Sequence, residues 1–182
     1  MKFTEQEIKE VWVIEPKVFF DERGYFMESF KKEVFEQHIG AINFIQDNES
    51  KSTRGVLRGL HYQTGDYAQA KLVRVLQGSV LDVVVDLRKS SPTFGQHVAV
   101  ELTEENKKQL FIPRGFAHGF LVLSEEAIFS YKVDNTYSPA HEASLLWCDP
   151  IVNIDWKIEE KELILSAKDK SGKPLSETTL FD

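Results

Sequence analysis

The chain has 182 residues, and its 22 Lys and Arg against 29 Asp and Glu give a formal net charge of −7. A chain of this length and hydrophobic content can bury one sizeable core, so we expect a single domain over residues 1–182. The acidic balance without a basic run excludes a nucleic-acid-binding surface, and no apolar stretch is long enough to span a membrane. One cysteine, Cys148, allows no intrachain disulfide, and the N-terminus has no apolar leader, so we expect a cytoplasmic protein.

The apolar pattern predicts short strands along most of the chain and one helix. The first strand is expected over 11–14, and the helix follows at 29–40, with apolar residues at 30, 34, 35 and 39. Ser29 is expected to cap the start of this helix and Gly40 to end it. A weaker helical turn is expected over 103–106 and a turn over 171–174. Further strands are expected over 56–63, 71–76, 80–87, 97–102, 110–112, 120–123, 127–133 and 143–147.

This arrangement of elements predicts the fold class. Many short strands with turn signals between them are typical of an antiparallel β-sandwich or barrel. The strand at 80–87 shows the alternation most clearly, because Val80, Asp82, Val84 and Asp86 share one face and Leu81, Val83, Val85 and Leu87 the other. We therefore expect a mainly β domain with few short helices.

Three places in these strands carry polar side chains that are candidates for a site. Strict alternation places Arg58 and His61 on opposite faces, so they share a site only if the strand is distorted, and Gly59 between them permits a bulge. Lys71 begins an apolar strand, and Tyr131 lies within another. Each residue alone is more typical of a structural role. Together they bring an imidazole, an ammonium and a phenol to one barrel, which favours an enzyme over an inert module.

Several sequence motifs of other enzyme classes are absent. The chain has no GxxxxGK[ST], GxGxxG or GxSxG pattern, so it has neither a P-loop nor a dinucleotide-binding fingerprint nor a nucleophile elbow. Neither HxH nor HExxH occurs, because Gln63 stands where the second histidine of a His61 pair would be. We expect neither a catalytic metal nor an organic cofactor.

Ordered motifs run from about residue 14 to residue 169. They are EPKVF (15–19), DERGYF (21–26), FIQDN (44–48), VLRGLHYQ (56–63), KLVR (71–74), DVVVDLRKSSPT (82–93), IPRGFAHGF (112–120), YK (131–132), YSP (137–139) and LSAKD (165–169). In this order and spacing they resemble the dTDP-4-dehydrorhamnose 3,5-epimerase family of nucleotide-sugar epimerases. The resemblance implies a cupin-type jelly-roll fold, no cofactor, and epimerisation of dTDP-4-dehydro-6-deoxy-D-glucose in dTDP-L-rhamnose biosynthesis.

The resemblance also implies residue roles. His61 is implied as the general base, Asp169 as its partner, Tyr131 as the general acid and Lys71 as the group that stabilises the enolate oxygen. It further implies a homodimer in which the N-terminal strand of one subunit completes the other subunit's site. The implied substrate-binding residues are Phe19, Arg23, Phe26, Glu28, Gln46, Asp47, Asn48, Arg58, His118, Glu142 and Lys168.

The reaction explains why these residue types are needed. A C–H beside a ketone is a weak acid, so the enzyme must supply a base and stabilise the enolate oxygen, and Lys71 can provide the positive charge. An imidazole titrates near neutral pH, and a carboxylate on its other nitrogen fixes its tautomer. Inversion needs the new proton to arrive from the opposite face, so His61 and Tyr131 must stand on opposing walls.

Three other functions remain open from the sequence. A relative that inverts only C3 or only C5, or that uses another nucleotide sugar, needs the same three groups. A non-catalytic sugar-binding cupin would bind without proton exchange. A metal-dependent cupin would need histidines assembled from separate strands, and the five His at 38, 61, 97, 118 and 141 are far apart in sequence.

Overall fold

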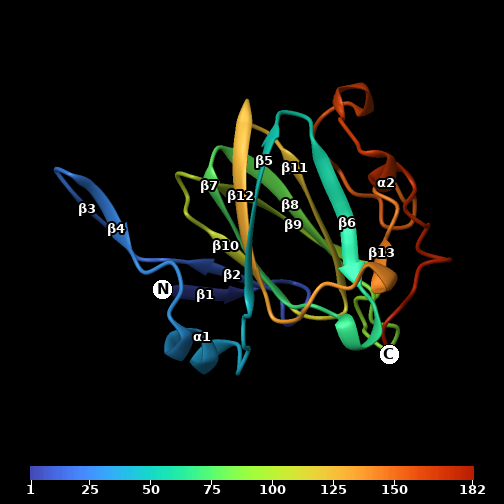
Figure 1. Cartoon of the computed structure of the whole chain (residues 1–182), viewed down its shortest axis with the longest axis horizontal. Helices are drawn as coiled ribbons and strands as arrows, with labels where there is room; N and C mark the ends of the chain where they lie inside the picture. The colour runs from blue at the N-terminus through green and yellow to red at the C-terminus, as the bar shows by residue number, and fades with distance from the viewer.

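The computed structural model describes residues 1–182, and two antiparallel sheets face each other across a shared core (Figure 1). The predicted antiparallel β-sandwich is confirmed. The six-stranded sheet runs in the order β1 (Lys2–Glu5), β2 (Trp12–Glu15), β10 (Gln109–Ile112), β7 (Lys71–Gln77), β12 (Glu126–Val133) and β5 (Gln46–Thr53). The five-stranded sheet runs in the order β13 (Glu142–Ser144), β6 (Leu57–Gln63), β11 (Phe116–Val122), β8 (Ser79–Asp86) and β9 (His97–Thr103).

The core between the two sheets follows from the alternation of side chains along each strand. On β8, Val80 and Val84 join the cluster between the sheets, whereas Val83 and Val85 join a second cluster on the outer face. The inner cluster includes large side chains such as Phe129, which is fully buried. The burial of both faces explains why β8 carries apolar residues on both of them and is buried from Val80 to Asp86.

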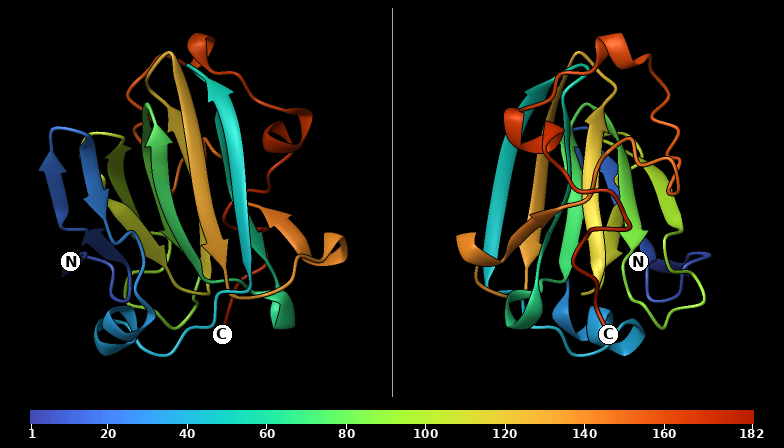
Figure 2. Two further views of the ribbon diagram at one scale, coloured as in Figure 1. Left: turned by 60° about the vertical axis from the view of Figure 1, so that its left-hand side comes forward. Right: turned by 90° about the vertical axis from the view of Figure 1, so that its right-hand side faces the viewer.

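The C-terminal segment covers the outer face of the five-stranded sheet (Figure 2). Leu145, Trp147 and Trp156 pack there, and the Trp156 indole N–H donates to the carbonyl of Trp147 at 2.9 Å. The segment contains η3 (Glu160–Glu162) and the short helix α2 (Ala167–Lys170). Its packing on the sheet fixes α2 at the edge of β6, and the two elements are in contact.

Helix α1 (Lys32–His38) covers part of the outer face of the six-stranded sheet. Phe35 of this helix contacts Phe30, Phe44 and Phe111 with ring centroids 5.3–5.6 Å apart. The predicted helix is present, but its predicted start at Ser29 is wrong, because the helix begins at Lys32 with Lys31 as its cap residue. The carbonyl of Ser29 instead accepts a hydrogen bond from the side chain of Gln109 at 2.6 Å. No helix is both long and apolar enough to cross a membrane.

Other predicted boundaries differ from the structure for local reasons. The strand predicted at 120–123 begins earlier, at Phe116, and the strand predicted at 143–147 ends at Ser144. The predicted helical turn at 103–106 is a hydrogen-bonded turn, in which the Thr103 hydroxyl accepts from the backbone N–H of Glu105 and Asn106. Strand β5 was not predicted, because its sequence QDNESKST has no apolar alternation.

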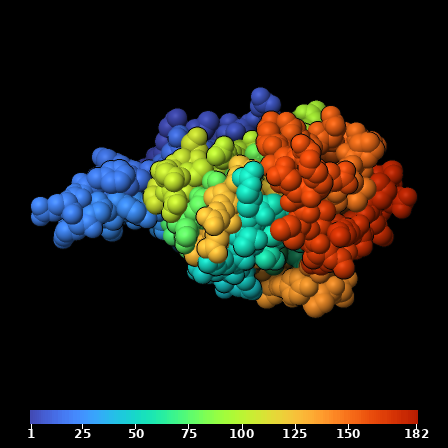
Figure 3. Space-filling view, turned by 90° about the horizontal axis from the view of Figure 1, so that it is seen from above, coloured from blue at the N-terminus to red at the C-terminus, as the bar shows by residue number.

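The hairpin of β3 (Val18–Asp21) and β4 (Gly24–Met27) extends away from the two sheets (Figures 1 and 3). It forms a separate two-stranded sheet and was not predicted. Phe19 and Phe26 pair across one face, and Phe20 and Tyr25 across the other. All four side chains are exposed: Phe19 by 50%, Phe26 by 67%, Phe20 by 77% and Tyr25 by 53%. A two-stranded hairpin is marginally stable alone, and this one has no apolar core of its own and exposes aromatic side chains on both faces.

Candidate functional site

A bulge in β6 places Arg58 and His61 on the same inner face. His118 of β11 pairs with His61, and Phe120 pairs with Arg58. The segment from Arg58 to His61 on β6 is therefore one residue longer than the segment of β11 opposite it. The distorted strand that the sequence requires for a shared site is therefore present. Gly59 permits it, because its φ is +148° and a Cβ there would lie 2.5 Å from the Cα of Gly119.

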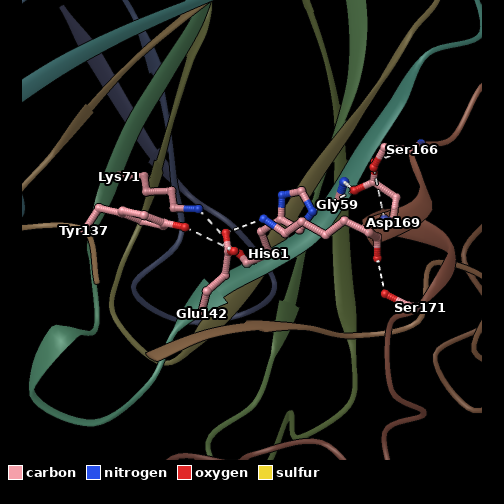
Figure 4. A network of polar contacts seen from close by, with 9 residues as sticks. Gly59, His61, Lys71, Tyr137, Glu142, Ser166, Asp169 and Ser171 are labelled. Atoms are coloured by element: carbon pink, nitrogen blue, oxygen red, sulfur yellow. Dashed lines mark hydrogen bonds and ion pairs between the residues drawn. The ribbon is translucent and has the colours of Figure 1, made fainter. Parts of the chain in front are cut away.

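His61 and Asp169 form a hydrogen-bonded pair at 2.7 Å between Nε2 and Oδ1 (Figure 4). Asp169 lies in the first turn of α2, where its carboxylate and the Ser166 hydroxyl form a capping box. Burial alone would raise the pKa of Asp169, but hydrogen bonds from His61, Ser166 and the Gly59 N–H lower that pKa to about 2. The carboxylate is therefore ionised and fixed, and it orients the imidazole.

Lys71 enters the same space from β7 of the facing sheet. Its Nζ lies 3.4 Å from the carbonyl oxygen of His61. Burial lowers the pKa of the Lys71 ammonium to about 8, although the nearby carboxylates of Asp82 and Glu142 oppose this effect. Lys71 is therefore mostly charged at neutral pH and sits in surroundings poor in water, where a fixed charge acts strongly.

Tyr131 stands on β12 of the six-stranded sheet, whereas His61 stands on β6 of the five-stranded sheet. The two residues thus project from facing walls. Burial raises the pKa of the Tyr131 phenol, while the Arg58 guanidinium opposes this effect. Arg58 in turn donates from Nε to the hydroxyl of Ser52 on β5 at 3.0 Å. Tyr131 is therefore protonated at neutral pH and available as an acid.

A group of charged side chains lies beside His61 and away from Asp169 (Figure 4). Glu142 of β13 accepts from the Tyr137 hydroxyl at 3.2 Å and pairs with the Lys168 ammonium. Burial would raise the pKa of Glu142, but these hydrogen bonds hold it below its usual value. The glutamate and lysine are two of the residues expected to bind substrate, and both are next to the dyad.

Other predicted binding residues fall in two places. Gln46 and Asn48 lie at the end of β5 that pairs with Val133 and Tyr131, and the Gln46 amide donates to the Asn48 side chain at 2.8 Å. Asp47, between them, faces the outer side of the sheet and pairs with Lys132 at 2.7 Å. His118 lies on the inner face beside His61.

The remaining four predicted binding residues are not brought to this site within the chain. Phe19, Arg23 and Phe26 belong to the extended hairpin, and Arg23 pairs with Asp21 of the same hairpin at 2.5 Å. Glu28 follows the hairpin and lies 3.8 Å from the Lys31 ammonium.

Sequence reasoning missed two buried polar residues of the site, Ser52 and Asp82. Ser52 holds Arg58, as described above, and lies in the polar strand that no apolar pattern could reveal. Asp82 contacts His118, and its place among valines on the inner face of 80–87 was visible in the alternation. The site residues also include no group of three or more His, Cys, Asp or Glu that could hold a metal ion.

Comparison with known proteins gives consistent matches over almost the whole chain. The family model described as dTDP-4-dehydrorhamnose 3,5-epimerase matches residues 5–177. The dTDP-4-dehydrorhamnose 3,5-epimerase of Shigella flexneri is 55% identical over 182 residues, covering 100% of this chain and 99% of that protein.

Solved structures agree with this match. The enzyme of the same name from Elizabethkingia anophelis NUHP1 is 52% identical, with a TM-score of 0.93 and 97% of each chain covered. A dTDP-6-deoxy-D-glucose-3,5-epimerase from Legionella pneumophila Philadelphia 1, in complex with dTDP-4-keto-L-rhamnose, is 50% identical, with a TM-score of 0.93 and 97% of this chain and 93% of that chain covered. The family resemblance and the cupin-type fold expected from the sequence motifs are therefore confirmed. This chain belongs to the dTDP-4-dehydrorhamnose 3,5-epimerase family.

Proposed function

We propose that this chain is an isomerase that epimerises C3 and C5 of dTDP-4-dehydro-6-deoxy-D-glucose to give dTDP-4-dehydro-L-rhamnose, in dTDP-L-rhamnose biosynthesis. One observation carries the proposal. The His61–Asp169 dyad stands on one sheet, Tyr131 on the facing sheet, and the Lys71 ammonium beside them. These are the base, the acid and the cation that inversion beside a ketone requires.

His61 acts as the base through Nδ1. Its Nε2 is hydrogen-bonded to the ionised Asp169, so the neutral ring carries its proton on Nε2 and keeps the Nδ1 lone pair free. Nδ1 takes the proton from the carbon beside the C4 ketone, and the electron pair of the broken C–H bond moves onto the ketone oxygen. Asp169 then stabilises the imidazolium that forms.

Lys71 stabilises the enolate oxygen. A single donor aimed at a developing oxyanion in a site of this kind contributes about 3–4 kcal/mol to the transition state. Tyr131 then gives its phenolic proton to the carbon from the opposite face, and the enolate collapses to the ketone. His61 then releases its proton to solvent and Tyr131 regains a proton from solvent, which restores both groups, and the same steps invert the second carbon.

The binding residues suit a nucleoside diphosphate sugar. Arg58 and Lys168 provide positive charge beside the dyad for phosphate oxygens. We further propose a homodimer in which the β3–β4 hairpin of one subunit carries Phe19, Arg23 and Phe26 to the site of its partner. The support for this is the exposure of the hairpin's aromatic side chains and its separation from the sheets of its own chain.

Solvent deuterium incorporation tests the proposed reaction. In D2O the enzyme should place deuterium at both C3 and C5 of the keto sugar, and NMR should show the inverted configuration at both carbons. Label at only one carbon would favour the single-carbon epimerase that the sequence leaves open. Binding of the sugar nucleotide without any label would favour a non-catalytic binding module, and loss of turnover with a chelator would favour a metal-dependent enzyme.

A further inference from the structure

Asp82 is a buried carboxylate that the steps above do not use. It lies on the inner face of β8 and is 0% exposed. Its only hydrogen-bond partner is His118, whose Nε2 lies 3.1 and 3.0 Å from the two carboxylate oxygens. A buried charge with so few partners is costly, and an unexplained one in a cleft is a candidate for function.

The other buried carboxylates of the chain show the contrast. Asp86 accepts from Arg88, Ser91 and Thr93, which closes the loop that follows β8. Asp149 accepts from three backbone N–H groups in the C-terminal segment. Both carboxylates therefore have a structural purpose that their contacts explain, whereas the single contact of Asp82 leads into the active site.

His118 and His61 form two parallel dyads on the inner face. They are direct partners in the ladder between β11 and β6, and each has a carboxylate on its Nε2. Burial lowers the pKa of His118, although the charge and the hydrogen bond of Asp82 oppose this effect, and the charges of Lys71 and His61 lower the pKa further. His118 is therefore neutral at neutral pH, with its proton on Nε2 facing Asp82 and its Nδ1 free as an acceptor.

The charge of Asp82 also acts on Lys71. The titratable groups facing Lys71 come from β6, β8, β11, β12, β13 and α2, and they are His61, Asp82, His118, Tyr131, Glu142 and Lys168. Of the two carboxylates among them, Glu142 is already paired with the Lys168 ammonium. Asp82 has no ion pair with any Lys or Arg, so its negative charge remains available to the Lys71 ammonium.

We propose that Asp82 is a positioning residue of this active site, which fixes the ring of His118 and keeps the Lys71 side chain charged inside the barrel. The proposal deepens the proposed function, because a neutral amine at Lys71 could not stabilise an enolate. It predicts that the alkaline limit of the enzyme's working pH range is set by the charge of Asp82 acting on the Lys71 ammonium, and not by the His61–Asp169 dyad.

The test is an NMR titration of Lys71 in the free enzyme, with Lys71→Arg used to assign its signal. The isosteric Asp82→Asn removes the charge and keeps an oxygen for His118. It should lower the Lys71 titration midpoint by about one pH unit or more. Asp149→Asn removes a buried carboxylate outside the barrel and should leave the midpoint unchanged. An unchanged midpoint in Asp82→Asn would overturn the proposal.

Two further readouts complete the test. In Asp82→Asn, the pH at which kcat/KM falls on the alkaline side should be lower than in the unaltered enzyme, by the same amount as the Lys71 titration midpoint. In the unaltered enzyme, 15N NMR should find the His118 proton on Nε2, and a proton on Nδ1 would contradict the proposed contact even if the variant failed to fold. Since both NMR measurements use no substrate, they hold or fail independently of the reaction proposed above.

Discussion

At the scale of single residues, the site depends on how the fold sets the charge of a few buried groups. Hydrogen bonds from His61, Ser166 and Gly59 keep Asp169 ionised, and burial raises the pKa of Tyr131 and keeps its phenol neutral. Burial also lowers the pKa of Lys71 to about 8, close to neutral pH. The motif around His61 was visible in the sequence, but its partner Asp169 is 108 positions away. The pattern of residues alone could not predict that His61 and Asp169 form a pair, and only the resemblance to a family implied it. Asp82 was missed because its partner His118 is likewise distant.

Asp169 should contribute to acid stability as well as to catalysis. Its pKa is about 2 in the folded chain, below the usual 3.8, so the ionised carboxylate stabilises the fold above about pH 4. That contribution of roughly 2 kcal/mol is lost as the pH falls through about 2. Urea denaturation should therefore show Asp169→Asn destabilised at about pH 5 and close to the unaltered protein at about pH 2. The exposed Glu7→Gln serves as control, and an equal deficit at both pH values would contradict the assignment.

At the scale of elements, strands with a clear apolar pattern were predictable, including β6, β7 and β12, which carry the candidate site residues. Strand β5 and the β3–β4 hairpin lack such a pattern and were not predicted. The strand at 80–87 has apolar residues on both faces and was predicted within one residue of β8. Strand β5 has polar residues on both faces, so no hydrophobic period marks it. The β3–β4 hairpin has aromatic residues on both faces and no core of its own, so its pattern fits neither a half-buried strand nor a helix.

The bulge in β6 should be intolerant of a side chain at Gly59. A Cβ there would lie 2.5 Å from the Cα of Gly119, and the φ of +148° is one that other residues avoid. Gly59→Ala should cost roughly 3 kcal/mol of folding free energy and move His61 out of line with Asp169. Gly65 also has a positive φ, +58°, but open space around it, so Gly65→Ala should cost about 1 kcal/mol. Equal losses in chemical denaturation would refute the role of the close approach.

At the scale of the whole molecule, the fold of one chain brings the base, the acid and the cation of the proposed reaction to one site. It does not bring all of the expected substrate-binding residues there. His61, Lys71 and Tyr131 meet inside one sandwich, while the hairpin that carries Arg23 points away from it (Figure 1). The net charge of −7 is compatible with an anionic substrate, because a few aimed cations suffice for a diphosphate. The proposed homodimer would bring the two sets together.

Mixing two defective variants tests this exchange. Arg23→Ala should weaken binding by losing a cation, and His61→Ala should lose the base. In a mixed dimer, one site combines the intact His61 of the first variant with the intact hairpin of the second. Refolding the variants together in equal amounts should restore about one quarter of the unaltered activity, since about half of the dimers are mixed and each has one complete site. No recovery, with dimers shown to form by light scattering, would refute hairpin exchange.

In the proposed mechanism, the base that removes the proton and the acid that returns it stand on facing walls. Removing the base in His61→Ala should lower the rate of proton exchange at both carbons by about 10²–10⁴-fold. This variant therefore shows the result expected when no proton is removed from the sugar.

The most direct measurement is therefore the fate of the keto sugar with Tyr131→Phe in D2O, followed by NMR. His61 should still exchange protons on its own face, so we expect deuterium in recovered sugar of unchanged configuration and little epimerised product. Full epimerase turnover by Tyr131→Phe would contradict the proposed mechanism, because Tyr131 on the facing sheet would then not supply the proton.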